Sequence, residues 1–326
     1  MLGKNIKIHL AKKLTDWANS VDNPEISEII LTKTIISGGS IVSLLNDEEP
    51  KDYDVYIKDL ESLLKISNYY LDKYKNSYKK LDDNDENSKL KEFVDDNKSF
   101  CIQTCYWNND KACWSVIEDN NYGKYDDIRL RCFIRSYGAA GEDVEASLFS
   151  LNKIKSNNKD KYYPKLFTNN AITLSDKIQL VLRFYGNADK IRSSFDFVHT
   201  LCYYDNSENK LELPSRSLEA IINKELYYIG SKYPLCSIIR TRKFLKKSYT
   251  IDASQYLKMV LQLNEMDLTN IHVLEEQLIG VDSVYFYSVI NKIKKDMKID
   301  EKIDIYYLIK LITEVFDKES VDTSDE

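Results

Sequence analysis

Glycine, proline and long apolar runs are all scarce in this chain of 326 residues. It has nine glycines and five prolines, so few positions interrupt a helix and long helices are expected. There is no apolar segment near the N-terminus of the kind found in secretory leaders, and no apolar run long enough to span a membrane. We therefore expect a cytoplasmic protein without a membrane partner.

Metal-binding patterns of cysteine and histidine are also missing. The six cysteines form no C-x-x-C pair and the three histidines are scattered, which argues against a zinc site and favours free thiols in a reducing compartment. An excess of positive charge is absent too, since the formal charge is −6. Any nucleic-acid binding would therefore need a local basic patch.

The length and the 43% of hydrophobic residues allow two packed domains. Residue patterns predict an α+β domain over 1–215, with a polar insertion at 79–98, an all-helical domain over 216–316 and an acidic flexible tail at 317–326. Within the first domain we expect helices at 5–20, from Pro24, 40–45, 59–78 and 174–185, strands at 34–37, 52–57, 100–117, 128–136 and 195–204, and a polar loop at 153–161.

A glycine pair stands between a predicted strand and a predicted helix. Gly38, Gly39 and Ser40 can offer backbone N–H groups to a triphosphate, with no Cβ in the way at the glycines. Asp52 and Asp54 follow, two residues apart on a strand, so their carboxylates share a face and can bind Mg²⁺ or Mn²⁺. The alternative is a tight turn followed by an exposed strand with two solvated acids.

This segment resembles the polymerase-β-like nucleotidyltransferase superfamily. The head of CCA-adding enzymes and bacterial poly(A) polymerases reads Gly-Gly-x-Val-Arg-Asp-x-Leu-Leu and then Lys-Asp-Phe-Asp. Here Gly38-Gly39, Leu44-Leu45 and Lys51-Asp52-Tyr53-Asp54 match that pattern over about residues 32–57. The resemblance implies a polymerase-β-like core with a mixed sheet, metal binding by Asp52 and Asp54, and triphosphate contacts from Gly39 and Ser40.

The match is incomplete in two places. Val42 and Ser43 stand where the family has Arg-Asp, and no Glu-Asp-x-x-Arg base-reading motif follows. The resemblance therefore implies nucleotidyl transfer rather than CCA synthesis. Much of the chain also resembles a family of tailed-phage proteins described as nucleotidyltransferases, which implies expression in a host cytoplasm and supplies no substrate.

The superfamily fold adds a third carboxylate from a later strand. We assign it to Asp196, on the strand predicted at 195–204, although an aspartate that caps a turn would fit the same pattern. Asp126, Asp127 and Glu145 are alternatives. His199 is interpreted as a histidine of the sheet rather than a catalytic base, because phosphoryl transfer depends mainly on positioning and metals.

A second candidate site is the basic stretch after Pro234. It carries five basic residues within eight positions: Arg240, Arg242, Lys243, Lys246 and Lys247. This stretch either binds a triphosphate or a nucleic-acid backbone, or forms a solvated helix face. Helical spacing predicts Arg240, Lys243 and Lys247 on one stripe.

Two functions fit these features. The first is metal-dependent transfer of a nucleoside monophosphate from an NTP to an acceptor hydroxyl on RNA (such as a tRNA-like end), a nucleotide or a protein. The second is a non-enzymatic phage structural or host-interaction protein on a degenerate nucleotidyltransferase fold. The acceptor, the choice of NTP and the oligomeric state are left open.

Overall fold

A computed structural model describes residues 3–78, 95–96, 99–110, 113–118, 121–125, 127–134, 161–278, 293, 303–310 and 313. The chain divides into two compact units, Met1–Trp107 with Trp114–Asn223, and Asn108–Cys113 with Lys224–Glu326. The polar segments predicted at 79–98 and 153–161 lie almost wholly outside the described residues, and the tail at 317–326 lies wholly outside them.

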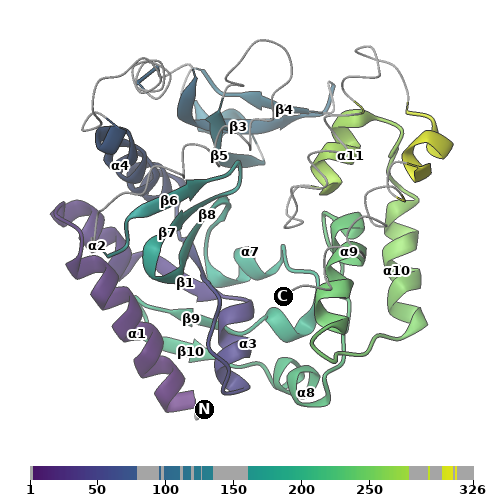
Figure 1. Ribbon diagram of the computed structural model, residues 1–326, viewed down its shortest axis with the longest axis horizontal. Coiled ribbons are helices and arrows are strands. Elements are labelled where there is room, and N and C mark those ends of the chain that lie inside the picture. Colours follow the sequence, from purple (N-terminus) through teal and green to yellow (C-terminus); the bar gives the residue numbers. More distant parts are fainter. Residues whose placement is uncertain are drawn as a thin grey trace. The chain divides into compact units, whose positions relative to one another are not determined.

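A seven-stranded mixed sheet forms the centre of the first unit (Figure 1). Its order is β10-β9-β1-β2-β8-β7-β6, and every neighbouring pair is antiparallel except β2 and β8, which are parallel. The strands are β1 (Thr34–Ser37), β2 (Tyr53–Ile57), β6 (Pro164–Phe167), β7 (Ala171–Leu174), β8 (Ile178–Tyr185), β9 (Tyr203–Asp205) and β10 (Lys210–Glu212).

The helices predicted before residue 80 are all present. Asn23 caps the second of them, because its side chain accepts hydrogen bonds from the backbone N–H groups of Glu25 and Ile26 while Pro24 takes the first helical position. The described helices of this unit are α1 (Gly3–Asn19), α2 (Pro24–Thr32), α3 (Gly39–Leu45), α4 (Leu60–Tyr78), α7 (Ala188–Arg192) and α8 (Ser215–Asn223).

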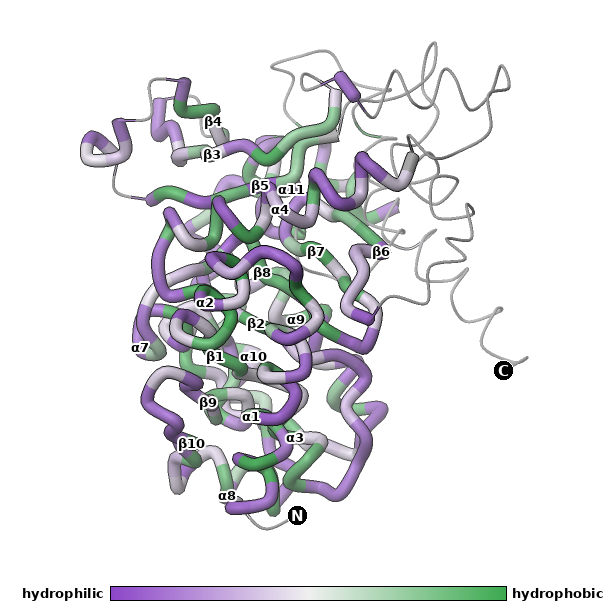
Figure 2. The backbone as a smooth tube through the Cα atoms, turned by 90° about the vertical axis from the view of Figure 1, so that its left-hand side faces the viewer, coloured by the Kyte–Doolittle hydropathy of each residue, from purple (hydrophilic) through white to green (hydrophobic). Residues whose placement is uncertain are grey.

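Residues of the central strands alternate between two hydrophobic clusters. Figure 2 colours the backbone of these strands by the hydropathy of each residue. Val55 and Ile36 face the main core, which they share with apolar residues of α1, α2 and α4. Tyr56 and Ile35 face the other side, in a smaller cluster with Ile191 of α7. Asp54 lies one residue from both Tyr53 and Val55 of the main core, so the alternation assigns it to the face of Tyr56.

A small antiparallel sheet packs against the main core. It has the order β4-β3-β5, from strands β3 (Phe100–Asn108), β4 (Cys113–Val116) and β5 (Ile128–Ile134), at the places predicted from sequence. Phe100, Leu130 and Cys132 are fully buried in the main core. Arg129 stacks over the ring of Trp114, with its guanidinium carbon 3.7 Å from the ring centroid.

The helix predicted at 174–185 is wrong, because this segment forms the end of β7, a 3₁₀ turn and β8. Ile178, Leu180 and Leu182 are completely buried at every second position, which is the period of a strand. The same apolar residues also fit a helical spacing roughly. Pairing with β2, more than a hundred residues earlier in the chain, determines the outcome.

The strand predicted at 195–204 is also largely wrong. Asp196 lies in a bend and Phe197 in an isolated bridge, residues Val198–Thr200 form a 3₁₀ turn, and only Tyr203–Asp205 is a strand. Ser217 of α8 donates a hydrogen bond to the carbonyl of Val198 at 2.7 Å, so contacts with a helix replace the ladder of a sheet.

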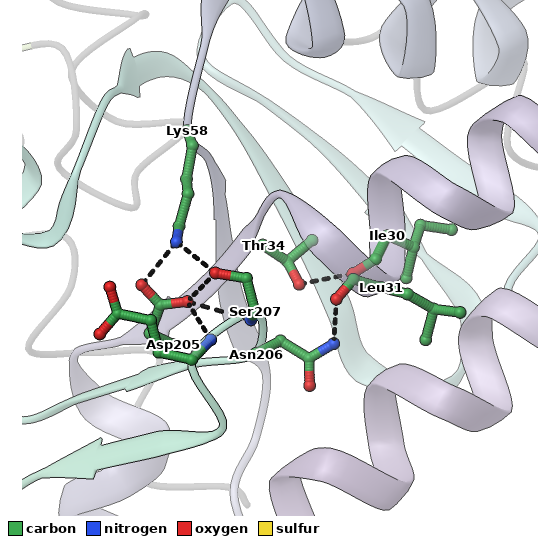
Figure 3. Close-up of polar contacts among 8 residues, drawn as sticks. Ile30, Leu31, Thr34, Lys58, Asp205, Asn206 and Ser207 are labelled. Carbon is green, nitrogen blue, oxygen red and sulfur yellow. Dashed lines mark hydrogen bonds and ion pairs between the residues drawn. The ribbon is translucent and has the colours of Figure 1, made fainter.

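The turn between β9 and β10 is held to the rest of the sheet by side chains (Figure 3). The buried carboxylate of Asp205 pairs with Lys58 at 2.7 Å and accepts hydrogen bonds from the N–H and the hydroxyl of Ser207. Asn206 donates to the carbonyl of Leu31 at 2.7 Å. These bonds fix β9 beside β1 at the end of β1 opposite Gly38.

The described part of the second unit is mainly helical, with α9 (Pro234–Leu245), α10 (Ala253–Leu263) and α11 (Ile271–Leu278). Its core is a separate cluster around Leu274, Leu278 and Ile293. The segments before α9 and after it are joined at the bridge between Glu225 and Thr250. Among the helices that the structure describes, none has the length and apolar character needed to cross a membrane.

Candidate functional site

Gly38 joins β1 to α3 in a conformation that suits only glycine well. Its φ is +89°, in the left-handed region, and it takes the N-cap position of α3. A Cβ built on Gly38 would lie 3.6 Å from Oδ2 of Asp54. The glycine turn and the first strand carboxylate are therefore neighbours in space, although 16 positions separate them in sequence.

Two further residues line the start of α3. A Cβ built on Gly39 would meet no heavy atom within 4 Å, so there is open space beside this residue. Ser40 is only 3% exposed, and its hydroxyl oxygen is buried without a hydrogen-bond partner in the described part of the chain. A buried hydroxyl without a partner is unfavourable, because it loses its hydrogen bonds to water. Within the described residues, Ser40 therefore has an unused hydrogen-bonding hydroxyl at the start of α3.

The two predicted carboxylates differ in their surroundings. Asp54 lies within β2, is half-buried, and stands opposite Gln179 in the parallel pairing with β8. Asp52 is exposed and directly precedes β2, which begins at Tyr53 rather than at Asp52. The structure thus brings Gly38 and Asp54 together. Asp52 lies outside the strand, two residues before Asp54.

A lysine that the sequence analysis missed holds the segment before Asp52. Nζ of Lys177 donates to the carbonyl of Pro50 at 3.1 Å and pairs with the carboxylate of Glu49. Asp176 and Lys177 are consecutive non-glycine residues with φ of +58° and +65°. Such conformations cost free energy, so contacts around the turn must stabilise them. This turn was missed in the sequence analysis because residues 174–185 were interpreted as one helix.

The strand residue between the two carboxylates is tied to α1. Tyr53 forms a 2.7 Å hydrogen bond between its hydroxyl and Nε2 of His9, and Lys13 lies over the rings of Tyr53 and Tyr162. Desolvation, with the nearby positive charges of Lys13 and Lys12, lowers the pKa of His9 below its usual 6.5. Burial, followed by the charge of Glu49, raises the pKa of Tyr53. These residues keep His9 neutral as a partner of Tyr53.

The third predicted carboxylate does not lie where it was expected. Asp196 is 4% exposed and sits in the bend after α7, while the strand next to β2 on that side is β8. The prediction that Asp196 stands on a strand adjacent to that of Asp54 is therefore wrong. His199 is buried in the 3₁₀ turn rather than in the sheet. Of the alternatives, Asp127 is exposed, and Asp126 and Glu145 lie outside the described residues.

Metal binding at this site would rest on two carboxylates. Within the described ranges, no group of three or more His, Cys, Asp or Glu side chains is placed to hold a metal ion. Mg²⁺ commonly takes one or two carboxylates together with substrate phosphates and water. Asp54, whose carboxylate lies beside Gly38, and Asp52, two residues before it, fit that mode and do not form a closed metal site on their own.

The predicted basic helix is present as α9 in the second unit. Arg240 is half-buried, with Nη2 3.3 Å from Sγ of Cys236. Lys243 is exposed on the last turn, whereas Lys247 lies beyond the helix, which ends at Leu245. The predicted single stripe of Arg240, Lys243 and Lys247 is therefore wrong, since helical spacing does not extend to Lys247.

Comparison with solved structures gives weak similarity. A "tRNA-processing enzyme with CTP" matches with a TM-score of 0.35 and 10% identity, over 90% of this chain and 63% of that chain. A "tRNA-processing enzyme (apo form I)" matches with a TM-score of 0.36 and 11% identity, over 100% and 68%. Scores at this level do not establish a shared fold.

Comparison of sequences is more informative. A protein of Bacillus phage SPbetaL7, "Gabija anti-defense 2", is 22% identical over 131 residues, which are 39% of this chain and 33% of that protein. The match thus spans about a third of the relative's length. The family model described as "Gabija anti-defense 2 family protein" matches residues 9–224, a range that includes Gly38, Asp54 and the whole seven-stranded sheet. Since this match covers more than half of its length, the chain belongs to the Gabija anti-defense 2 family.

Proposed function

We propose that the chain transfers a nucleoside monophosphate from an NTP to an acceptor hydroxyl. The observation that carries the proposal is the proximity of the Gly38 turn to the carboxylate of Asp54, where a Cβ would lie 3.6 Å from Oδ2. A turn without side chains beside a strand carboxylate allows phosphate groups and a metal ion to lie close to the backbone. The buried, unpaired hydroxyl of Ser40 supplies a donor for a phosphate oxygen.

Each residue has a defined part in this proposal. Gly38 and Gly39 let the triphosphate approach the backbone, and Ser40 donates a hydrogen bond to it. Asp52 and Asp54 hold Mg²⁺ or Mn²⁺, which when bound neutralises phosphate charge and activates the attacking oxygen. The acceptor oxygen forms a bond to the α-phosphorus, the bond from that phosphorus to the bridging oxygen breaks, pyrophosphate leaves, and the hydroxyl proton passes to solvent.

The acceptor and the remaining phosphate contacts are less constrained. Arg240, Arg242, Lys243 and Lys247 are proposed contacts for nucleotide or acceptor phosphates, based on their charge. Acceptors compatible with the chemistry are an RNA end, a nucleotide or a protein side chain. Family membership favours a role against the Gabija defence system in a host cytoplasm, where a modified component of that system would be the product.

The test is transfer of label from each α-³²P-labelled NTP, with Mg²⁺ or Mn²⁺, to total RNA or to lysate from cells that contain the defence system. Asp54→Asn should abolish transfer while the protein stays folded. Ser40→Ala should leave the melting temperature unchanged or higher, because an unpaired buried hydroxyl is removed, and should weaken NTP binding. Transfer that is equal in wild type and Asp54→Asn would refute the proposal.

A second function follows from two observations, the family description and the two-carboxylate site among the described residues. In this alternative, the chain binds a host defence protein without catalysis. Metal-dependent NTP binding separates the two: an excess of NTP and Mg²⁺ over Kd should stabilise an enzyme by a few kcal/mol. Anti-defence activity that survives in Asp54→Asn would support the non-enzymatic function.

A further inference from the structure

A cluster of lysines gathers at a turn of the second unit, and it shares Lys247 with the phosphate contacts proposed above. Between residues 224 and 252 the chain has seven basic and two acidic residues, in a protein whose formal charge is −6. Lys246 and Lys247 follow α9, and Lys224 precedes it by ten positions. The positive charge is therefore concentrated in one short part of an acidic chain.

Backbone hydrogen bonds bring the two ends of this stretch together. The N–H of Thr250 donates to the carbonyl of Lys224 at 2.7 Å, and the N–H of Leu226 donates to the carbonyl of Thr250 at 2.9 Å. Nζ of Lys224 also lies 3.4 Å from the carbonyl of Lys247. Lys224 and Lys247 are thus neighbours across a closed turn, which the linear sequence does not indicate.

The charges of the three lysines are not neutralised by ion pairs in the described part of the chain, although Glu225 and Asp252 lie close to the turn in sequence. Lys246 and Lys247 are exposed and Lys224 is partly buried, and none of the three forms an ion pair with the described residues. Lys224 and Ser248 both have left-handed backbones, with φ of +52° and +65°. Like charges repel one another, so an external anion would stabilise this arrangement.

We propose that this lysine turn, defined by Lys224, Lys246 and Lys247, binds the phosphate backbone of a nucleic-acid strand. Lysine ammonium groups act as point charges for phosphates, and a series of them follows a backbone with a repeating charge. Protein interfaces, in contrast, are depleted of lysine and rely on exposed aromatic and arginine anchors. Tyr249, the aromatic residue that follows the turn, is buried at 4% exposure and is not available as an anchor.

The inference concerns binding and holds whether or not the chain is a transferase. The experiment measures the affinity of the full chain for fluorescein-labelled single-stranded RNA, single-stranded DNA and duplex DNA by anisotropy at several salt concentrations. The three probes share the backbone, and their comparison identifies the preferred strand. The variant is Lys224→Gln with Lys246→Gln and Lys247→Gln. Its control is Lys4→Gln with Lys12→Gln and Lys165→Gln, which removes the same charge from exposed lysines of the first unit.

Wild type should bind at least one probe with a steep salt dependence. The turn variant should lower the slope of log K against log salt by about two to three units, and the control variant should leave it unchanged. Lys246 lies after the helix, so Lys246→Glu alone should leave the fold intact and weaken binding further than Lys246→Gln. This single variant replaces the triple variant if the latter does not fold. Asp54→Asn should bind nucleic acid like wild type, which separates this inference from the transferase proposal.

Four results would overturn the inference, of which the first three concern the nucleic-acid probes. These are no binding of any probe at low salt, equal slopes for wild type and the turn variant, and equal losses in the turn and control variants. Retention of a polyglutamate chain without retention of nucleic acid would also overturn it, because the turn would then be a surface for acidic protein.

Discussion

At the scale of single residues, the candidate site depends on what is absent from Gly38 and what is unpaired at Ser40. The first has no side chain where Asp54 approaches, and the second has a hydroxyl without a partner in the described part of the chain. Both features support a ligand more directly than the presence of two aspartates does, because acidic pairs are common in a chain with 52 acidic residues. Asp54 is a candidate metal ligand because Gly38 and Ser40 lie at the same turn.

Substitution of the two glycines should have opposite effects. Gly38→Ala places a Cβ on a residue with φ of +89°, next to Asp54, and should lower the free energy of unfolding by about 1–2 kcal/mol and reduce transfer. Gly39→Ala is the matched control, because its Cβ meets open space and alanine favours helices, so stability should be unchanged or higher. Urea unfolding of both variants gives the comparison. A stable Gly38→Ala would contradict the backbone conformation described here.

His9 should contribute a pH dependence to stability. Its folded pKa is lowered, so its contribution is fully present above the ordinary value of 6.5 and is lost as the pH falls through the lower folded value. A protonated His9 has no lone pair on Nε2 with which to accept a hydrogen bond from the hydroxyl of Tyr53. Between pH 7 and pH 5 the melting temperature of wild type should therefore fall more than that of His9→Gln, which does not titrate. Parallel curves would show that His9 has no such linkage.

At the scale of elements, the sequence predicted correctly those helices and strands whose formation depends on residues nearby in the chain. The helix after Pro24 has a proline at its first position and an asparagine cap, both visible in sequence. The segment 174–185 failed because its apolar spacing suits two periods, and its partner β2 lies far away in the chain. The segment 195–204 failed because α8 supplies hydrogen bonds that a strand would otherwise make.

The same distinction applies to the site. The neighbourhood of Gly38 and Asp54 was predicted because one short strand–helix–strand unit contains both. Lys177 and His9 were missed, since each reaches the site through the sheet or from α1, and no local motif marks such contacts. In the lysine turn, Lys246 and Lys247 belong to the basic stretch predicted from sequence, whereas Lys224 was missed because it joins them through a backbone bridge.

The turn between β9 and β10 provides a test of element stability. Asp205→Asn removes the charge that pairs with Lys58 and places an amide opposite an ammonium group, so unfolding should become easier by about 1.5–3 kcal/mol. Glu212→Gln breaks the exposed pair with Lys210 on the same hairpin and should change stability by less than about 1 kcal/mol. Thermal or urea unfolding distinguishes them. Equal effects would mean that Asp205 is not a structural anchor.

At the scale of the whole molecule, two independent cores accompany the two units. All buried residues of the main core lie before residue 224, and the family match also ends at 224. We expect a fragment of residues 1–223 to fold cooperatively and to keep the NTP-dependent rise in melting temperature. The same fragment should lose nucleic-acid binding, because Lys224, Lys246 and Lys247 are removed. Calorimetry and anisotropy measure the two properties, and an unfolded fragment would show that the first unit needs the second.

The position of β2 has a consequence for motion. It is the middle strand of seven, with β1 on one side and β8 on the other, and each ladder would have to break before β2 could shift. Opening of a sheet proceeds from its edges, so the amides of β2 should be among the last to exchange with deuterium. Asp54 would then stay fixed throughout a reaction cycle, and any closure around a substrate would have to come from the segments outside this strand.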